Sequence, residues 1–406
     1  MKSDIDTLMK ERNLDALMIL GNAEHNPPMY YLTGGGHVSK AVLIKKLGKP
    51  AVLYVNAMER DEAEKSGLKV VPMRQGAMTE LSQKPKEIFG EHDLLSGRVG
   101  VYGETNVSMA LHIENRIKDE LPELELIGED QGDSLFMYAM EAKDESEAAR
   151  IRKMGKVTTI VVDKVRDYLT SCDVRDDEAL LKEDGAPLTV GDVHSKIRLW
   201  VSEQGAELPS GFIFAIGRDA GVPHSAGSPS DLMKLGQTIV FDIYPAEAGG
   251  GYYYDFTRTW SLGYATPEAQ KLYDEVKDVY DKVIENIDLN VSFKEYNKMV
   301  CDEFGKNGHN TPLNMEGVVT EGYVHSLGHG VGLNIHERPW SSPSSSDNNI
   351  LKPGVVITVE PGLYYPEKGM GVRIEDSYWI RPDGVLEKLA EYPYDFVLPM
   401  KKWKKE

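Results

Sequence analysis

The sequence predicts an α+β protein of two domains, a small α/β domain over residues 1–145 and a larger α+β domain over residues 146–406. Three observations support this prediction. The length of 406 residues exceeds that of a usual single domain. Short apolar runs of strand length alternate with helical patterns in the first part of the chain. A long segment with apolar residues at helical spacing then opens the second part.

The strands predicted for the first domain are DALMIL, KAVLIKK and PAVLYV, which Gly, Asn and Pro turn signals separate. The segment EAARIRKMGKVTTIVVDKVRDYL, just after Ser146, keeps helical spacing over several turns and predicts a long helix. We therefore place the domain boundary near residue 145. The chain shows no internal repeat at solenoid periods.

Composition argues against some classes of partner. With 46 Lys and Arg against 65 Asp and Glu, the formal net charge of -19 disfavours binding to nucleic acid. No apolar stretch reaches the roughly 18 residues that a bilayer crossing needs, so no membrane partner is expected. Only Cys172 and Cys301 are present, and the first 20 residues lack the pattern of an export signal. These features predict a cytoplasmic protein.

Two acids of the second domain stand in or beside apolar strands. The segment from Gln237 to Leu262 contains two β-rich runs joined by a Gly-rich connection, which predicts a long-looped hairpin carrying Asp242 and Asp255. Burying a carboxylate in a strand is costly unless the group is paired, hydrogen-bonded or bound to a cation. A single buried Asp is more often structural, so this pair alone leaves both interpretations open.

Further candidate ligands follow along the chain. His325, His329 and His336 fall within twelve residues of a Gly-rich stretch, and Glu360 and Glu375 each follow an apolar run of strand character. Four carboxylates and one imidazole exceed the needs of one tetrahedral site and suit two divalent cations bridged by carboxylates. Two dications would also balance the four negative charges.

These motifs resemble the pita-bread metallopeptidase family, which includes Xaa-Pro dipeptidases (prolidases), aminopeptidase P, methionine aminopeptidases and the metal-free creatinases. The resemblance spans nearly the whole chain, because DALMIL and MYYLTGGG are similar to the amino-terminal domain of the prolidase and creatinase branches. It implies a C-terminal pita-bread domain preceded by a creatinase-like α/β domain. It also implies five metal ligands: Asp242, Asp255, His329 in GHGVG, Glu360 in TVEPG and Glu375. Of these, Asp255 and Glu375 are expected to bridge the two metal ions.

The same resemblance assigns roles to other residues. His224 in PHSAG and His336 in NIHE match residues that contact the substrate and assist at the scissile bond. Glu360 is expected to move the proton of the attacking water. His325 and Arg373 resemble outer residues that steady ligands or contact the substrate. The expected cofactors are two divalent metal ions, manganese first, with cobalt, zinc or iron as alternatives.

The implied function is a homodimeric metallopeptidase that cleaves the bond before proline in short peptides through a metal-bridging hydroxide. An Xaa-Pro dipeptidase and an aminopeptidase P both fit, and Arg338 is a candidate for binding a substrate carboxylate. The spacing of thirteen between Asp242 and Asp255 is longer than the family's and bears on substrate fit. Two alternatives stay open: a non-catalytic pita-bread binding module, and a non-peptidase metal-dependent hydrolase or lyase on the same fold.

Overall fold

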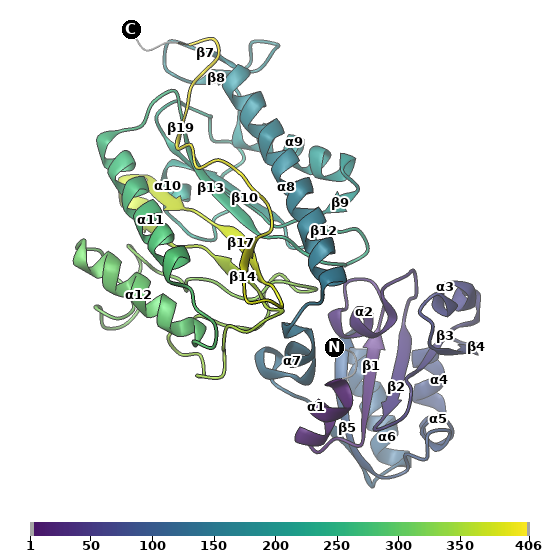
Figure 1. Cartoon of the computed structure of the whole chain (residues 1–406). Coiled ribbons are helices and arrows are strands. Elements are labelled where there is room, and N and C mark those ends of the chain that lie inside the picture. The colour runs from purple at the N-terminus through teal and green to yellow at the C-terminus, as the bar shows by residue number, and fades with distance from the viewer. Residues whose placement is uncertain (1–3, 404–406) are drawn as a thin grey trace. The chain divides into compact units, whose positions relative to one another are not determined.

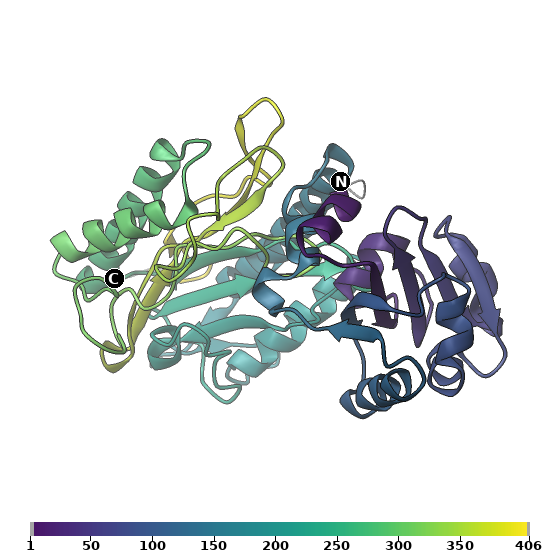
Figure 2. The same cartoon turned by 90° about the horizontal axis from the view of Figure 1, so that it is seen from below.

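The computed structural model describes residues 4–403, which form two compact units of mixed helix and sheet (Figures 1 and 2). The first unit extends to Ala142 and also includes the loop Ala248–Gly251. The second unit contains Lys143–Glu247 and continues from Tyr252. Within residues 4–403, no helix combines the length and the apolar character that crossing a membrane requires.

A mixed sheet forms the centre of the first unit. Its strands are β1 (Ala16–Gly21), β2 (Ala41–Lys46), β3 (Val52–Asn56), β4 (Lys69–Met73), β5 (Gly97–Glu104) and β6 (Leu124–Ile127). Among the described residues these six strands follow the order β4-β3-β2-β1-β5-β6. β1 runs parallel to β5 and antiparallel to β2. The three strands predicted from the sequence are thus confirmed as β1, β2 and β3.

Helices connect and cover these strands. They are α1 (Ile5–Glu11), α2 (Pro27–Thr33), α3 (Arg60–Glu64), α4 (Ala77–Gln83), α5 (Pro85–Gly90), α6 (Val107–Glu120) and α7 (Leu135–Glu141). Helices α4, α5 and α6 bury Leu81, Phe89 and Ile117 against Met18 and Ile44 of the sheet. This apolar layer is the core of the first unit.

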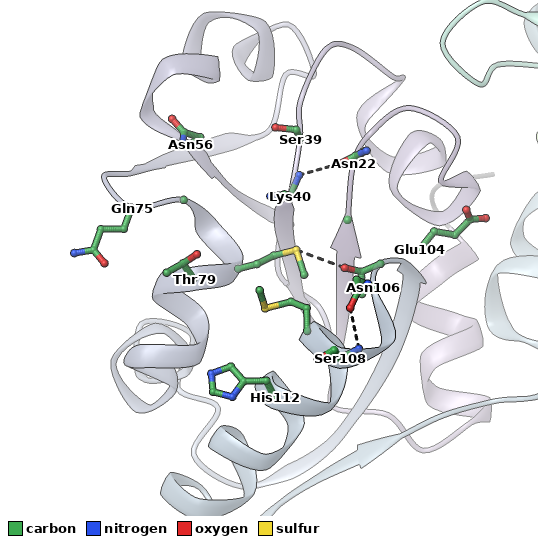
Figure 3. A pocket seen from close by; sticks show the side chains of 15 residues that line it. Asn22, Ser39, Lys40, Asn56, Gln75, Thr79, Glu104, Asn106, Ser108 and His112 are labelled. Atoms are coloured by element: carbon green, nitrogen blue, oxygen red, sulfur yellow. Dashed lines mark hydrogen bonds between the residues drawn. The ribbon is translucent and has the colours of Figure 1, made fainter.

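A hollow of about 670 Å³ opens at the carboxyl ends of β1, β3 and β5 (Figure 3). At its edge the side chain of Asn22 accepts a hydrogen bond from the Lys40 backbone N–H at 3.0 Å. Glu104 and His112 are the one carboxylate and the one imidazole among the described residues that line it, and both are exposed. The hollow therefore lacks the group of buried acids that a divalent metal site uses.

The helices of the second unit are α8 (Glu145–Ser171), α9 (Val190–Glu203), α10 (Gly217–Ala220), α11 (Pro267–Asn286) and α12 (Phe293–Lys306). The long helix predicted after Ser146 is confirmed as α8. It begins with a capping box, in which Asp144 accepts from the Glu147 N–H at 3.0 Å and Glu147 accepts from the Asp144 N–H at 2.9 Å. These two bonds satisfy backbone donors that a helix start otherwise leaves free.

The strands of this unit are β7 (Asp173–Val174), β8 (Leu180–Leu181), β9 (Ala206–Glu207), β10 (Phe212–Ile216), β11 (Thr238–Ile243), β12 (Ala246–Glu247), β13 (Phe256–Leu262), β14 (Val356–Val359), β15 (Gly362–Tyr365), β16 (Met370–Arg373), β17 (Asp376–Ile380), β18 (Leu386–Lys388) and β19 (Val397–Leu398). In the described chain, the two larger sheets have the orders β10-β11-β13-β19 and β14-β17-β18. Figure 1 shows the strands between α8 and α9 on one side and α11 and α12 on the other.

The main core of the second unit lies under α11 and α12. These helices bury Val276, Tyr280 and Phe304 against Ile357 and Ile374 of the strand region. Every residue of β11, β13, β14 and β17 is buried. Polar side chains on these strands are therefore held in fixed positions by the packed residues around them.

We predict that Gly103→Ala destabilises the first unit while Gly128→Ala does not. Gly103 has φ +102°, and a Cβ there would collide with the backbone carbonyl oxygen of Leu20 in the neighbouring strand. At Gly128 the same atom would meet nothing within 4 Å. We expect Gly103→Ala to lower the free energy of unfolding by about 2 kcal/mol or more. Urea denaturation followed by circular dichroism measures this, and equal effects of the two substitutions would contradict it.

Candidate metal centre

Asp242 and Asp255 are positioned by the antiparallel pairing of β11 with β13. The register sets Asp242 opposite Thr257, and Asp255 directly precedes β13. The predicted hairpin is therefore confirmed. Both carboxylates are buried, with 8% and 5% of their surface exposed. Because their strands lie in the packed core, the two groups have little freedom to move apart.

His329 lies in a loop that is tied to β14. The Thr358 N–H donates to the His329 carbonyl at 2.9 Å, and the His329 N–H donates to Thr358 Oγ1 at 3.1 Å. Its Nδ1 lies 3.0 Å from the Gly330 carbonyl oxygen, which assigns the ring hydrogen to Nδ1 and leaves the Nε2 lone pair free. Burial lowers the pKa of His329 to about 4, so the ring is in its neutral, ligating form near pH 7.

Glycine allows this loop to approach the segment that carries His336. Gly330 bridges both Glu337 and Ile357, and a Cβ at Gly330 would collide with the carbonyl oxygen of Arg338. As a result the rings of His329 and His336 pack edge to face with their centroids 4.4 Å apart. The Gly-rich pattern around the histidines thus reflects close packing of backbone segments.

Glu360 and Glu375 lie at strand ends near the hairpin. Glu360 follows β14, and its N–H donates to the Leu327 carbonyl at 2.8 Å. Glu375 lies between β16 and β17 and pairs with Thr257: its N–H donates to the Thr257 carbonyl at 3.1 Å. Glu375 Oε2 also accepts from Thr257 Oγ1 at 2.6 Å. These bonds fix Glu375 beside the residue that faces Asp242.

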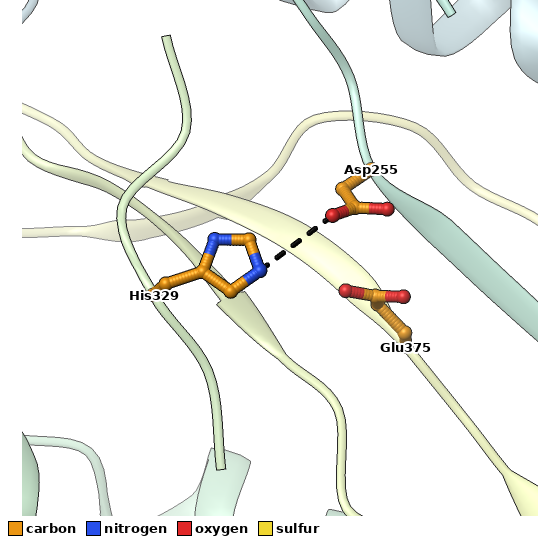
Figure 4. A group of neighbouring side chains, drawn as sticks. All are labelled: Asp255, His329 and Glu375. Atoms are coloured by element: carbon orange, nitrogen blue, oxygen red, sulfur yellow. Dashed lines mark ion pairs between the residues drawn. The ribbon is translucent and has the colours of Figure 1, made fainter. Parts of the chain in front are cut away.

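Asp255, His329 and Glu375 form a tight cluster, in which one ligand atom from each residue lies within 4.8 Å of the others (Figure 4). His329 Nε2 is 3.7 Å from Asp255 Oδ2 and 3.3 Å from Glu360 Oε1. In Figure 4 the imidazole and the two carboxylates point toward one another. The free nitrogen of His329 therefore faces carboxylate oxygens from separate strands.

Burial and mutual repulsion disfavour the charged forms of these acids. Burial raises the pKa of Asp255 and of Glu375 well above the usual range, and the charges of the neighbouring carboxylates raise both further. Burial likewise raises the pKa of Glu360 to about 8, although the positive charge of Arg373 opposes this shift. The protein alone thus provides too little positive charge for this group of acids.

Two carboxylate oxygen atoms of the site test whether its residues fit a cation. Asp242 Oδ1 and Glu375 Oε1 are buried and have no hydrogen-bond partner in the described part of the chain. A buried carboxylate oxygen without a partner is costly, and a divalent cation supplies the attraction that it lacks. Carboxylates with one neutral imidazole are a donor set that Mn²⁺, Co²⁺, Fe²⁺ and Zn²⁺ accept. The residues therefore fit divalent metal ions.

Arg373 holds Asp242 from the cavity wall. Both side chains are buried and form an ion pair through Arg373 Nη2 and Asp242 Oδ2. Arg373 Nη1 donates to Tyr364 Oη at 2.7 Å, and Tyr364 Oη donates to His325 Nε2 at 2.9 Å. His325 Nδ1 in turn donates to the Ser326 carbonyl at 2.7 Å. Because these polar atoms are engaged within the protein, the geometry favours a ligand-steadying role for His325 and Arg373.

One cavity of about 910 Å³ brings together nine of the residues singled out as site candidates: His224, Asp242, Asp255, His325, His329, His336, Glu360, Arg373 and Glu375. His224 and His336 are exposed to this cavity. Arg338 does not line it among the described residues, since its side chain is 2% exposed and donates to the Asn348 carbonyl at 3.1 Å. Its burial disfavours the carboxylate-binding role considered from the sequence.

A buried ion pair behind His336 was not predicted. Lys143 Nζ lies 2.6 Å from Glu337 Oε2, with 2% and 0% of the two side chains exposed. Glu337 Oε1 accepts from the Asn334 N–H at 2.9 Å. The pair therefore fixes the backbone on both sides of His336. The two residues are 194 positions apart in the sequence. The one local sign of the pair is that Glu337 directly follows His336.

Comparison with known proteins shows matches along nearly the whole chain. Residues 149–382 match the model of metallopeptidase family M24, and residues 3–130 match the creatinase/prolidase N-terminal domain. The Xaa-Pro dipeptidase of Pyrococcus horikoshii is 26% identical over 93% of each chain. That of Pyrococcus furiosus is 28% identical, covering 95% of this chain and 97% of the relative. The solved structure of the Pyrococcus furiosus prolidase matches with a TM-score of 0.73 at 25% identity, over 96% of this chain and 99% of that one.

We predict opposite effects of two Asp→Asn changes on the metal-free protein. Asp255→Asn removes a repelling charge and is expected to raise the midpoint of thermal unfolding in the presence of a chelator. Asp242→Asn leaves the buried Arg373 without its counter-ion and is expected to cost about 3–5 kcal/mol. Calorimetry with chelator, then with added Mn²⁺, measures both. Equal destabilisation by the two changes without metal would contradict the charge argument.

We predict that Lys143→Met destabilises the second unit by about 3–5 kcal/mol, because it leaves the carboxylate of Glu337 buried without a counter-ion. The double variant Lys143→Met with Glu337→Met is expected to recover much of this loss, since no buried charge remains. Urea denaturation of the single and double variants measures the coupling. Simple addition of the two single effects would show that the pair is not coupled.

Proposed function

This chain belongs to metallopeptidase family M24, and we propose that it hydrolyses the peptide bond before proline in short peptides with two divalent metal ions. Its predicted fold, a pita-bread domain preceded by a creatinase-like domain, is confirmed by the two family models and by the prolidase structures. The observation that carries the proposal is the convergence of four carboxylates and the Nε2 atom of His329 on one cavity, with two buried carboxylate oxygens that have no partner among the described residues.

We assign Asp242, Asp255, His329, Glu360 and Glu375 as the residues that would hold the metal ions, and Asp255 and Glu375 as the ligands that the two ions would share. When bound, such ions polarise a carbonyl and lower the pKa of water, which is the chemistry that amide hydrolysis near neutral pH requires. Manganese is the first metal to test, because a site rich in oxygen donors suits it. The assignment is supported by the burial of Asp242, Asp255, His329 and Glu375 and by the convergence of ligand atoms from Asp255, His329 and Glu375.

The remaining residues act on the substrate and on the proton. Glu360, whose carboxylate lies in the cavity, is placed to accept the proton of the attacking water and to pass it on. His224 and His336 expose their imidazoles to the same cavity and can donate hydrogen bonds to the carbonyl oxygen and to the proline nitrogen as it leaves. A neutral imidazole carries one such donor.

Specificity for proline follows from what its peptide bond lacks. An Xaa-Pro bond is a tertiary amide without an N–H, so a pocket for it needs shape in place of an acceptor for that hydrogen. Phe212, Ile213, Ile335 and Trp340 contribute apolar surface to the cavity lining. We propose that the proline ring packs on this surface. The relatives named as Xaa-Pro dipeptidases support this substrate class.

Three further expectations belong to the proposal. The resemblance to prolidases supports a homodimer. Both cysteines, Cys172 and Cys301, are buried and free, as in a chain that folds in a reducing compartment, and this supports a cytoplasmic location. A dipeptidase is favoured over an aminopeptidase P because the two Pyrococcus relatives, which match more than nine-tenths of this chain, carry the former name.

We predict that His329→Ala lowers both the metal content and the rate of Gly-Pro cleavage. The expected loss in kcat/KM is about 100-fold or more, because the electrostatic contribution of the metal ions is lost. The control is His112→Ala, which changes an exposed histidine of the first unit and should retain both. Metal analysis of purified protein accompanies the assay in Mn²⁺. If the wild type binds metal but cleaves neither Gly-Pro nor Gly-Pro-X, another hydrolase or a lyase is favoured. If the wild type neither binds metal nor cleaves these peptides, a binding module is favoured.

A further inference from the structure

The turn that leads to His336 is closed by Glu337. The backbones of Gly330 and Glu337 exchange two hydrogen bonds, in which each N–H donates to the other's carbonyl at 2.8 Å. The side chain of Glu337 reaches back to the middle of the turn, where its Oε1 accepts from the Asn334 N–H at 2.9 Å. One residue therefore ties the end of the turn to its start and to its middle, and His336 directly precedes that residue.

Lys143 fixes the carboxylate of Glu337 to a segment of the second unit that is far away in the sequence. Its Nζ lies 2.6 Å from Glu337 Oε2, and both side chains are buried. The backbone N–H of Lys143 donates to the Gly354 carbonyl at 2.7 Å, just before the capped start of α8. The ion pair packs so closely on the turn that a Cβ at Gly332 would collide with Glu337 Oε2. The turn thus has little room to shift.

The imidazole of His336 has no comparable support. His325 and His329 each place a ring nitrogen against a neighbouring carbonyl, whereas no group within residues 4–403 forms a hydrogen bond with the ring of His336. Its aromatic contact is the edge-to-face packing on His329, with 4.4 Å between the centroids. The position of the ring therefore follows the backbone of the turn. Neither Glu337 nor Lys143 lines the described part of the cavity, so neither touches a substrate bound there.

Small displacements of a catalytic donor are costly. A shift of about 1 Å can lower the rate about 100-fold, because the hydrogen bond offered to the transition state is then misdirected. We propose that Glu337 is a positioning residue for peptide hydrolysis: its carboxylate, held by Lys143, sets the direction in which His336 donates to the substrate. This inference rests on the proposed function and adds to it two residues that lie outside the cavity.

The test is the double variant Lys143→Met with Glu337→Met (the Met pair), which removes the bond to Asn334 without leaving a buried charge. With Gly-Pro in Mn²⁺ we expect kcat to fall about 10- to 100-fold, while KM and the metal content stay within about twofold of the wild type. The loss falls on kcat because a donor aimed at the transition state adds little to substrate binding. The control, Lys45→Met with Asp6→Met, removes an ion pair of equal length, 2.6 Å, from the first unit and should leave kcat unchanged.

A mutant cycle with His336→Ala separates positioning from stability. If Glu337 acts through His336, the Met pair should lower kcat by less than about twofold once His336→Ala has removed the imidazole. A loss of folded protein would instead multiply with the loss of the imidazole. Multiplied effects would overturn the proposal. Loss of metal in the Met pair would also overturn it, because the ion pair would then act on His329.

A second double variant, Lys143→Met with Glu337→Gln, tests the bond to Asn334 itself. The amide keeps an oxygen that can accept from the Asn334 N–H, and the variant again carries no charge at these positions. We expect it to recover most of the kcat that the Met pair loses, and an equal loss in the two variants would overturn the proposal.

Glu337→Asp provides the test if the Met pair does not fold. It keeps both charges but withdraws the carboxylate by about 1.5 Å, so kcat should fall about tenfold or more at unchanged metal content. Full activity of this variant would overturn the proposal.

Failure of the peptidase function would be seen separately. If the wild type cleaves no proline peptide with Mn²⁺, Co²⁺, Fe²⁺ or Zn²⁺, the proposed function is wrong, and NMR of histidine-labelled protein then reports the position of the His336 ring. Its signal, assigned from its absence in His336→Ala, should move in the Met pair and stay in the control, because packing on the ring of His329 sets its chemical shift. An unmoved signal would overturn the role of Glu337.

Discussion

Repulsion among buried carboxylates is the constraint on which the site depends. Asp242, Asp255, Glu360 and Glu375 share one cavity, and the burial of Asp242, Asp255 and Glu375 removes the water that would otherwise screen their charges. The fold brings them together nonetheless, because each lies in or beside a strand whose residues are all buried in the packed interior. Hydrophobic packing thereby holds in place a charge arrangement that is unfavourable by itself, and bound cations convert it into a favourable one.

Buried hydrogen bonds and an ion pair fix the strands that carry Asp255 and Glu375 relative to each other. Arg258 is fully buried and donates to the backbone carbonyls of Thr257 and Glu375, each at 2.9 Å. It also forms an ion pair with Asp376 at 2.9 Å, and Tyr280 Oη donates to the second oxygen of Asp376 at 2.6 Å. One guanidinium thus joins the strand after Asp255 to the strand after Glu375. Asp255 and Glu375, which we propose as the shared ligands, would thus be linked through the protein even before metal binds.

The local chemistry of the site could be predicted from the sequence, whereas its long-range contacts could not. Strand character around Asp242 and Glu360, and the Gly-rich setting of His329, are local patterns, and the hairpin that carries Asp255 is confirmed. The bonds of Lys143 with Glu337 join segments far apart in the chain, and no spacing rule relates them. For the same reason the sequence suggested Arg338 as a carboxylate binder, because its burial against the Asn348 segment is visible only in the structure.

The distribution of the ligands along the chain ties metal binding to the completion of folding. Asp242 and Glu375 are 133 positions apart, and α11 and α12 lie between them in the sequence. A chain that has formed only the first hairpin holds two acids of the set, and the imidazole and the last two carboxylates arrive with later strands. Tight metal retention is thus a property of the finished second unit alone, and partly folded chains should exchange metal freely with their surroundings. Retention of metal by the purified protein would therefore report that the second unit has folded completely.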